Sequence, residues 1–529
     1  MLEGASSIHK HLRRELEDYI KAQYFGKSPV LLDAITDSLD SEGLLYREPY
    51  IESSPAYTVA GDGIRNSRVL PEWLRDFLCR LADSGLGVYS SPYTHQINAL
   101  ELAHAGNDLF VSTGTGSGKT ECFIWPLLAK LADEAKHSPT TWQQRGVRAL
   151  IMYPMNALVS DQLSRLRRLI GDSEGKFLRL FRQTCGKDSR RPQFGMYTGR
   201  TPYPGAAPDT HDDRELEQTI KKYVFSKDSA YREKLTASGR LPAKADIHAF
   251  IERLHDGEHI PDDDDAELVT RFEMQQFTPD ILITNYSMLE YMLLRPIEAK
   301  IWQDSKAWLS MNENNRLLFV IDEAHMYRGS AGGEVALLIR RLMHKLGISR
   351  ERVQFILTTA SMPDSSPQDR ENVMTFAEEL TSAGKNGTFS YLTGERENIS
   401  SFAHYDLDAQ TLLKLTAESF EDENTRLAAL NDLWGKTFTS LDEAYAWMFD
   451  NLAACRQFNT LIQSCRDNAV SLRELSVRIF PDLAGDDALH CMSVLLSVAP
   501  LARSAKKYCA LPRTNAYALQ GDQGSLCLH

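Results

Sequence analysis

The sequence has few cysteines and no arrangement of them that predicts a disulfide or zinc scaffold. It holds eight cysteines in 529 residues, without a Cys-x-x-Cys pair or a regular spacing. Such cysteines are typical of a reducing compartment, where they serve mostly as small hydrophobic side chains. The terminal Cys527-x-His529 offers two ligands, too few for a structural zinc ion. We expect no zinc site from this chain alone.

Long apolar segments and a basic charge balance are also missing. No apolar run approaches the ~20 residues that span a bilayer, and residues 1–21 are charged throughout, without a secretory apolar core. The net charge is −13, which argues against a membrane-surface protein. We therefore expect a cytoplasmic protein whose contacts with nucleic acid, if made, come from a small cluster or from backbone amides.

No internal repeat or long low-complexity linker divides the chain, and its length allows two to four domains. Residues 1–87 have mainly helical patterns, with a loop over 48–66, and suggest an N-terminal accessory region. Residues 88–366 alternate short apolar runs with amphipathic helices, interrupted by a charged insertion at about 202–270. Residues 367–529 are again mainly helical and suggest a second accessory region.

Four continuous apolar runs, at 147–153, 281–284, 317–321 and 353–358, are the clearest strands. Buried parallel strands have this character. Their alternation with helices predicts an α/β domain with a parallel sheet, whose ligands bind at the carboxyl ends of the strands.

The segment from Thr113 to Thr120, Thr-Gly-Thr-Gly-Ser-Gly-Lys-Thr, follows an apolar run and precedes another. This order predicts a strand, a phosphate-binding loop and a helix. Glycines allow the backbone N–H groups to face phosphate oxygens, and the helix N-terminus adds its positive dipole. Lys119 is suited to the β- and γ-phosphates and Thr120 to Mg²⁺. The predicted nucleotide-binding residues are Thr115, Gly116, Ser117, Gly118, Lys119 and Thr120. Thr113 stands where this motif usually has its first glycine.

Two adjacent carboxylates, Asp322 and Glu323, follow the apolar run at 317–321. Asp322 is suited to hold Mg²⁺, and Glu323 to orient and deprotonate an attacking water. Upstream of the glycine loop, Gln96 could donate to and accept from an adenine edge, and Tyr93 could stack on the base.

These segments resemble the motifs of superfamily 2 helicases of the DEAD/DEAH type. Gln96, residues 116–120 and residues 322–325 resemble motifs Q, I and II. Further resemblances follow in order at 153–162 (motif Ia), 197–201 (the glycine motif), 278–285 (motif Ib) and 359–361 (motif III). The amino-acid sequence of residues 285–293 and 327–329 is similar to that of the Lhr/MrfA-like branch and of large helicases of bacterial phage-defence systems.

The resemblance implies a RecA-like P-loop lobe that uses ATP and Mg²⁺ and binds nucleic acid, with DNA favoured. The implied catalytic residues are Lys119, Asp322, Glu323 and His325, with Thr359 and Ser361 coupling hydrolysis to movement. The implied nucleic-acid residues are Asn156, Arg165, Arg168, Thr198, Gly199, Arg200, Thr284 and Asn285. An apolar stripe at Val159, Leu163, Leu166 and Ile170 independently predicts that Arg165 and Arg168 face solvent.

Such helicases have a second RecA-like lobe, whose Gln-x-x-Gly-Arg-x-x-Arg motif does not occur after residue 361. We expect that lobe to be supplied by a longer protein or by a partner subunit, and hydrolysis by this chain alone to be slow. The predicted function is the ATP-binding lobe of a DNA helicase or translocase in phage defence or DNA repair. A nucleotide-switched scaffold subunit of a defence complex remains an alternative, and motifs Ia, Ib and III argue against an unrelated P-loop kinase.

Overall fold

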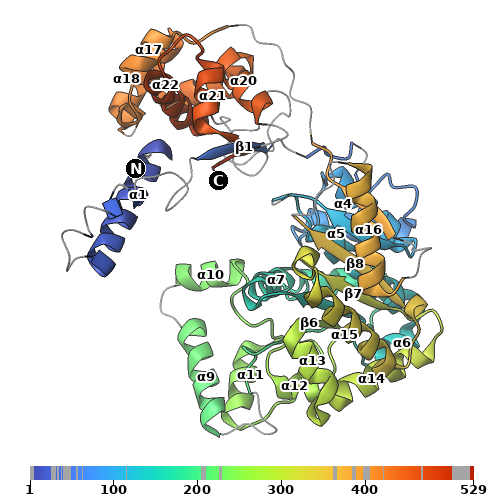
Figure 1. The fold of residues 1–529 in the computed structure, drawn as a ribbon. Coiled ribbons are helices and arrows are strands. Elements are labelled where there is room, and N and C mark those ends of the chain that lie inside the picture. The colour runs from blue at the N-terminus through green and yellow to red at the C-terminus, as the bar shows by residue number, and fades with distance from the viewer. Residues whose placement is uncertain are drawn as a thin grey trace. The chain divides into compact units, whose positions relative to one another are not determined.

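The computed structural model describes residues 5–25, 31, 35–36, 38–39, 49–54, 57–61, 63–114, 116–203, 210–225, 229–360, 366–383, 389–396, 405–420, 422–465, 469–502 and 525–528. Contacts divide the chain into two compact units. One comprises Met1–Tyr57 with Arg396–His529, and the other comprises Thr58–Glu395. Figure 1 shows the helices and strands of each unit, and each unit has its own hydrophobic core.

An eight-stranded sheet forms the centre of the unit Thr58–Glu395. Its strand order is β5-β4-β6-β3-β7-β8-β2-β9, and every neighbouring pair is parallel. The strands are β2 (Asp108–Ser112), β3 (Ala149–Tyr153), β4 (Phe194–Tyr197), β5 (Glu267–Leu268), β6 (Ile281–Asn285), β7 (Leu317–Ile321), β8 (Val353–Thr359) and β9 (Phe389–Thr393). The predicted α/β class with a parallel sheet is confirmed.

Helices cover both faces of this sheet (Figure 1). Along β2, Leu109 and Val111 enter one core and Phe110 the other, because successive side chains of a strand point to opposite faces. The first face carries α3 (Glu72–Asp83), α4 (Thr94–His104), α5 (Glu121–His137), α7 (Asn156–Leu169) and α8 (Lys176–Cys185). The second carries α13 (Tyr286–Leu294), α14 (Ala299–Met311), α15 (Ser330–Leu346) and α16 (Pro367–Thr381).

The bounds of this unit differ from the predicted 88–366. Residues 58–87 include α3, whose Leu74, Phe77 and Leu78 are buried in the core. The Phe77 ring lies edge-on to Phe177 of α8, with ring centroids 6.5 Å apart. Residues 367–395 include α16 and β9, and β9 pairs with β2. Helical periodicity alone cannot reveal this, because it does not say which core a helix joins.

The charged region at about 202–270 contains α9 (Thr210–Val224), α10 (Ser229–Ala237) and α11 (Ile247–His255). Ile220, Phe250 and Leu254 form a small separate core. The end of this region is part of the central sheet, since β5 pairs with β4. A strand of two residues is too short to leave a periodic signal.

The acidic run 262–265 includes one buried residue. The Asp265 side chain is fully buried and lies 3.1 Å from Lys244 Nζ. Asp264 forms an ion pair with Arg182, 2.7 Å away. Ion pairs of this kind explain how part of an acidic run can be buried.

The unit Met1–Tyr57 with Arg396–His529 is mainly helical, as its sequence predicts. It comprises α1 (Ala5–Ile20), α17 (Ala409–Lys414), α18 (Glu423–Trp434), α19 (Leu441–Asn451), α20 (Arg456–Ser464), α21 (Leu472–Ile479) and α22 (Gly485–Val498). The side chains of Ser440 and Ser471 cap α19 and α21 by accepting from the N–H groups of Glu443 and Glu474.

The predicted loop at 48–66 is wrong at residues 50–54, which form β1 (Tyr50–Ser54). This strand pairs antiparallel with β10 (Val470–Ser471) and β11 (Ser525–Leu528). Its partners are more than 400 residues away, so nothing near it in the sequence indicates a strand.

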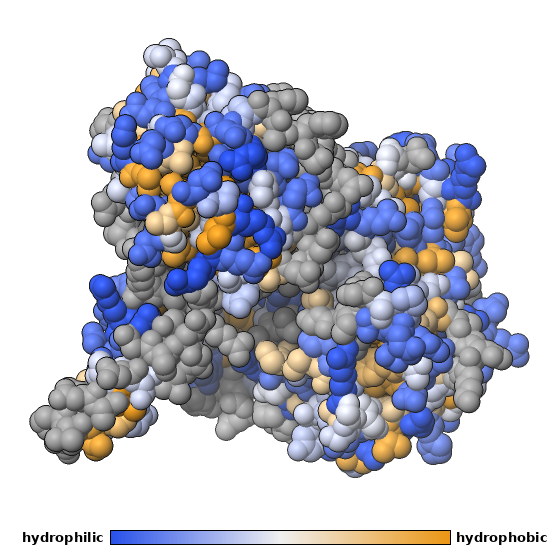
Figure 2. All heavy atoms as spheres, turned by 45° about the horizontal axis from the view of Figure 1, so that its top comes forward, coloured by the Kyte–Doolittle hydropathy of each residue, from blue (hydrophilic) through white to orange (hydrophobic). Residues whose placement is uncertain are grey.

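Hydrophilic residues make up most of the described surface on the face shown in Figure 2. No bilayer-spanning helix is found in the described part of the chain. Both observations agree with the apolar side chains being collected in the cores.

Candidate nucleotide-binding site

The predicted phosphate loop connects β2 to α5 at the carboxyl edge of the sheet. Gly116 and Gly118 have φ values of +73° and +71°, in the region that glycine adopts without steric cost. Gly118 also lies close to Gln96, because an added Cβ would be 2.2 Å from Gln96 Nε2. Ser117 Oγ donates to Thr113 Oγ1 over 2.7 Å. Thr113, which replaces the usual first glycine, thus makes a hydrogen bond that links the start of the loop to Ser117.

Lys119 and the acidic pair meet across this edge. Lys119 Nζ lies 3.4 Å from Glu323 Oε1, and the two side chains are 13% and 24% exposed. Strands β2 and β7, which deliver them, belong to the same sheet with β8 between them. The structure therefore brings the loop lysine and the acidic pair into one partly enclosed site.

Asp322 is held in a fixed orientation. Its Oδ1 accepts hydrogen bonds from the Thr358 hydroxyl and from the Glu323 N–H, the latter at 2.9 Å. Burial raises the pKa of this carboxyl, although the Thr358 hydrogen bond opposes the shift. A buried, oriented carboxylate next to Lys119 is the kind of oxygen ligand that a Mg²⁺–phosphate complex requires.

Glu323 has an unusual backbone and an unusual side chain. Its φ is +51°, a left-handed conformation that costs a non-glycine residue roughly 1–2 kcal/mol and is concentrated at functional sites. Its Oε2 is buried and accepts no hydrogen bond from a described residue, with His325 Nδ1 3.3 Å away. His325 Nδ1 is hydrogen-bonded to Thr359 Oγ1 over 3.1 Å. The acidic pair is therefore connected to the end of β8.

The first turn of α4 contacts the phosphate loop. Gln96 Nε2 donates to Gly118 O over 3.2 Å, and its Oε1 accepts from the Tyr93 N–H over 2.9 Å. The Tyr93 ring stacks on His95, with centroids 5.6 Å apart. Gln96 is 2% exposed. The structure thus gives Gln96 a contact with the loop backbone, and its predicted contact with adenine stays a prediction.

Three polar side chains at this site had no role in the sequence analysis. His95 Nε2 is hydrogen-bonded to Ser117 O over 2.9 Å, and burial lowers its pKa. Gln162 Nε2 donates to Thr120 Oγ1 over 3.3 Å. Thr358 supports Asp322. Gln162 is the last residue of the predicted motif Ia and His95 adjoins Gln96, but a one-dimensional pattern does not say which loop atom each contacts.

The residues present fit a magnesium nucleotide. The left-handed glycines open the backbone for phosphate oxygens, Lys119 supplies a cation, and Thr120 and Asp322 supply oxygen ligands. The described residues contain no group of three or more His, Cys, Asp and Glu side chains that could hold a metal. Mg²⁺ does not need one, since it usually takes one or two carboxylates and completes its shell with phosphates and waters.

Six of the eight predicted nucleic-acid residues lie at or just after the carboxyl ends of β3, β4 and β6, whereas Arg165 and Arg168 lie on α7. They fall into three groups. Asn156 and Asn285 are joined directly, with 2.7 Å between Asn285 Nδ2 and Asn156 Oδ1. Asn285 Oδ1 also caps α13 by accepting from the Met288 N–H. This bond ties the start of α7 to the start of α13.

Thr198 and Thr284 form the second group, and their side chains are buried. Thr284 Oγ1 donates to Tyr197 O over 2.7 Å, and Thr198 Oγ1 accepts from the Arg200 N–H over 3.2 Å. Both residues are at most 1% exposed. Their side chains therefore stabilise the loops after β4 and β6 and are not exposed for contact with a nucleic-acid strand.

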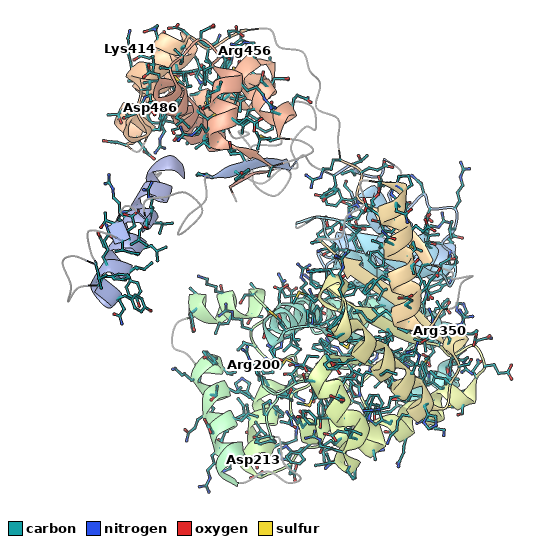
Figure 3. All side chains as sticks on the ribbon, in the orientation of Figure 1. Arg200, Asp213, Arg350, Lys414, Arg456 and Asp486 are labelled. Carbon is teal, nitrogen blue, oxygen red and sulfur yellow. The ribbon has the colours of Figure 1, made fainter. Side chains whose placement is uncertain are left out.

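The arginines and Gly199 form the third group. Arg165 lies 3.0 Å from Glu121 and 3.3 Å from Asp161, so its charge is already shared. Arg168 and Arg200 are exposed, and so is Gly199. Arg200 is labelled in Figure 3, on the loop after β4. Thr115 and Ser361, also predicted, lie outside the described residues.

Comparisons with known proteins agree with the motifs. The family model DEAD/DEAH box helicase matches residues 93–213 and 246–369. The chain is 38% identical over 554 aligned residues to Druantia protein DruE of Escherichia coli (strain UMEA 4076-1), covering 94% of this chain and 29% of that protein. It is 25% identical to the uncharacterized ATP-dependent helicase YprA of Bacillus subtilis (strain 168), covering 51% of this chain and 23% of that protein.

Among solved structures, the chain is similar to DUF1998 helicase MrfA bound to DNA and AMPPNP. The identity is 17%, the TM-score is 0.34, and the match covers 76% of this chain and 42% of that one. The chain spans less than a third of the length of DruE and of YprA.

Proposed function

This chain carries a DEAD/DEAH box helicase domain, and we propose that the domain binds ATP and Mg²⁺ as the first lobe of a nucleic-acid helicase or translocase. The observation that carries the proposal is the 3.4 Å approach of Lys119 Nζ to Glu323 Oε1, beside the buried Asp322. A cation, a metal ligand and a candidate base at one edge of a parallel sheet match the requirements of phosphoryl transfer.

Each side chain has a defined role in this proposal. Lys119 holds the β- and γ-phosphates, and the N–H groups of residues 116–120 hold their oxygens. Thr120 and Asp322 hold Mg²⁺, which neutralises phosphate charge when bound. Glu323 orients and deprotonates the attacking water. His325 and Thr359, which are hydrogen-bonded, connect this site to the end of β8.

The nucleotide site is tested by titrating the chain with a fluorescent ATP analogue in the presence of Mg²⁺. Lys119→Ala is expected to abolish binding, because it removes the cation from the phosphates. Glu323→Gln is expected to bind the analogue as the unchanged chain does, since it removes only the base. Equal binding by the Lys119→Ala variant would contradict the proposal.

Hydrolysis by this chain alone is expected to be slow. In related phosphoryl-transfer systems an arginine supplied in trans contributes ~10³–10⁵ in rate, and in two-lobed helicases the second lobe supplies it. Fast, DNA-stimulated turnover by the isolated chain would contradict this expectation. In a two-lobed assembly, retained turnover with Glu323→Gln would exclude Glu323 as the base.

Single-stranded DNA is the proposed nucleic acid, and phage defence or DNA repair the proposed setting. The 38% identity to Druantia protein DruE supports a large helicase of a defence system. Arg168, Gly199 and Arg200 are the predicted nucleic-acid residues that are exposed and therefore accessible to a nucleic-acid strand. Binding to labelled DNA and to RNA of the same sequence, measured against salt, tests both the interaction and the preference.

A nucleotide-switched scaffold is the second candidate, favoured by two observations. Arg165 is occupied by Glu121 and Asp161, and the side chains of Thr198 and Thr284 are buried, which leaves few groups for a phosphate backbone. Absence of single-stranded DNA binding at low salt, together with intact ATP binding, would favour the scaffold over the translocase.

A further inference from the structure

Gln162 lies on α7, where its side chain contacts the start of α5. Its Nε2 donates to Thr120 Oγ1 over 3.3 Å, and the residue is 6% exposed. Its Oε1 is buried and accepts no hydrogen bond from a described residue. A buried amide oxygen without a partner costs about 1–3 kcal/mol. A hydrogen-bond donor to Gln162 Oε1, close to the candidate metal ligand Thr120, would remove this cost.

A metal-bound water is a donor that suits this position. Mg²⁺ keeps several waters when it binds to proteins and phosphates, and neighbouring ligands of its octahedron lie about 3 Å apart. Such waters turn a lone pair to the metal and both hydrogens outward. Because the amide nitrogen of Gln162 already donates to Thr120 Oγ1, the oxygen of the same amide would be near a water that binds the metal next to Thr120.

We propose that Gln162 is a positioning residue of the magnesium site, with Nε2 orienting the Thr120 hydroxyl and Oε1 accepting from a metal-bound water. The inference rests on the proposed function, in which Thr120 and Asp322 hold Mg²⁺. It gives a hydrogen-bond donor to Gln162 Oε1, which is buried and accepts no hydrogen bond from a described residue.

Helix α7 would then respond to the metal. Three residues beyond Gln162, Arg165 makes a second bond between the same two elements, 3.0 Å from Glu121 of α5. At the first residue of α7, Asn156 bonds to Asn285, which ends β6 and caps α13. Magnesium occupancy is thereby connected through one helix to the residues proposed to lie near nucleic acid.

The test measures how much Mg²⁺ strengthens binding of a fluorescent ATP analogue, by titrating the full chain with Mg²⁺ and with EDTA. Gln162→Leu is expected to reduce this gain by about tenfold, the lower end of the effect of losing an outer-shell partner. Its affinity in EDTA is expected to stay unchanged. Gln162→Glu keeps an acceptor for the water and is expected to retain the gain.

Gln354→Leu is the matched control. Gln354 is also a buried glutamine, 8% exposed, but its Nε2 donates to Ala103 O and Asn107 O on α4 and the turn after it. Its replacement has a similar cost in stability and is expected to leave the Mg²⁺ gain unchanged. Thermal unfolding of each variant shows whether it is folded.

The outcomes separate the two proposals. An unchanged Mg²⁺ gain in Gln162→Leu, or an equal loss in Gln354→Leu, overturns the role of Gln162 while leaving the proposed function intact. Failure of the unchanged chain to bind the analogue overturns the proposed function, and this inference falls with it. If Gln162→Leu does not fold, the Mg²⁺ gain is measured for Gln162→Asn, whose amide is one methylene further from Thr120. A reduced gain supports the role of Gln162, and an unchanged gain overturns it.

Discussion

Arg165 and Arg200 were predicted to have the same role, but at the scale of single residues they differ in what surrounds them. Arg165 shares its guanidinium between Glu121 and Asp161, whereas Arg200 is exposed on the loop after β4. A charge that is already paired must lose its partners before it can bind a phosphate. The two arginines are therefore not equivalent candidates for nucleic-acid contact.

Arg200→Ala is expected to weaken single-stranded DNA binding and to lower the slope of log K against log salt by about 0.7, the value of one phosphate contact. Arg165→Ala is expected to change that slope less. It should instead lower the free energy of unfolding by about 1 kcal/mol, because the pair is partly exposed. Fluorescence anisotropy across a salt series, with urea unfolding of both variants, measures the two effects. A larger loss of slope in Arg165→Ala would reverse the assignment.

At the scale of elements, the two ends of the strands have different tasks. The carboxyl ends of β2 and β7 carry the candidate site. The amino ends of β3, β6 and β4 are joined by Arg148, Asp280 and Arg190. Asp280 is 2.6 Å from Arg190 and 3.1 Å from Arg148, and Arg148 lies between the rings of Trp142 and Trp308. Arg148 and Asp280 are fully buried and Arg190 is 10% exposed, so the cluster links the amino ends of three neighbouring strands largely out of contact with water.

Asp280→Asn is expected to destabilise the protein by about 3 kcal/mol at pH 7, because it leaves buried arginines without a counter-charge. Burial by itself raises the pKa of Asp280, but Arg190 and Arg148 outweigh it and the net pKa is lowered. The ionised carboxylate therefore stabilises the fold above the ordinary aspartate pKa of about 4, and this contribution is lost as the pH falls through the lowered value.

Urea unfolding of both proteins between pH 7 and the acid limit of folding measures this dependence. The stability difference between the unchanged chain and Asp280→Asn should be largest at neutral pH and should shrink below about pH 4. A difference that grows toward acid pH would show that the carboxylate does not stabilise the cluster.

At the scale of the whole molecule, the contacts of α3, α16 and β9 decide where the unit of the candidate site begins and ends. These elements lie outside the predicted range 88–366 but supply core side chains and one edge of the sheet. Conversely, β1 lies near the N-terminus and pairs with β10 and β11, which come from the far end of the sequence.

A fragment of residues 58–395 is expected to fold alone and to bind the ATP analogue as the full chain does. A fragment of residues 88–366 is expected to aggregate or to unfold at a lower denaturant concentration. It lacks Leu74, Phe77 and Leu78 of α3, and it exposes the edge of β2 that β9 covers. Circular dichroism and binding titrations of both fragments check this. Equal stability of the two would support the shorter bounds.

The parts that could be predicted are those whose signal is local. The apolar runs at 317–321 and 353–358 became β7 and β8, because burial of a strand depends on a few adjacent residues. The two-residue β5 and the strand β1 were missed, since both owe their existence to distant partners.

The order of residues along the chain determined the parallel α/β class, the glycine loop, and the strand that delivers Asp322 and Glu323, because each is specified by side-chain types at short spacing. Only the tertiary structure decided that Lys119 and Glu323 approach within 3.4 Å, that Arg165 is neutralised by Glu121, and that Gln162 bonds to Thr120 while its own oxygen stays unpaired. The physical reason is that hydrogen bonds and ion pairs depend on distances of a few ångströms between segments that the chain order leaves far apart.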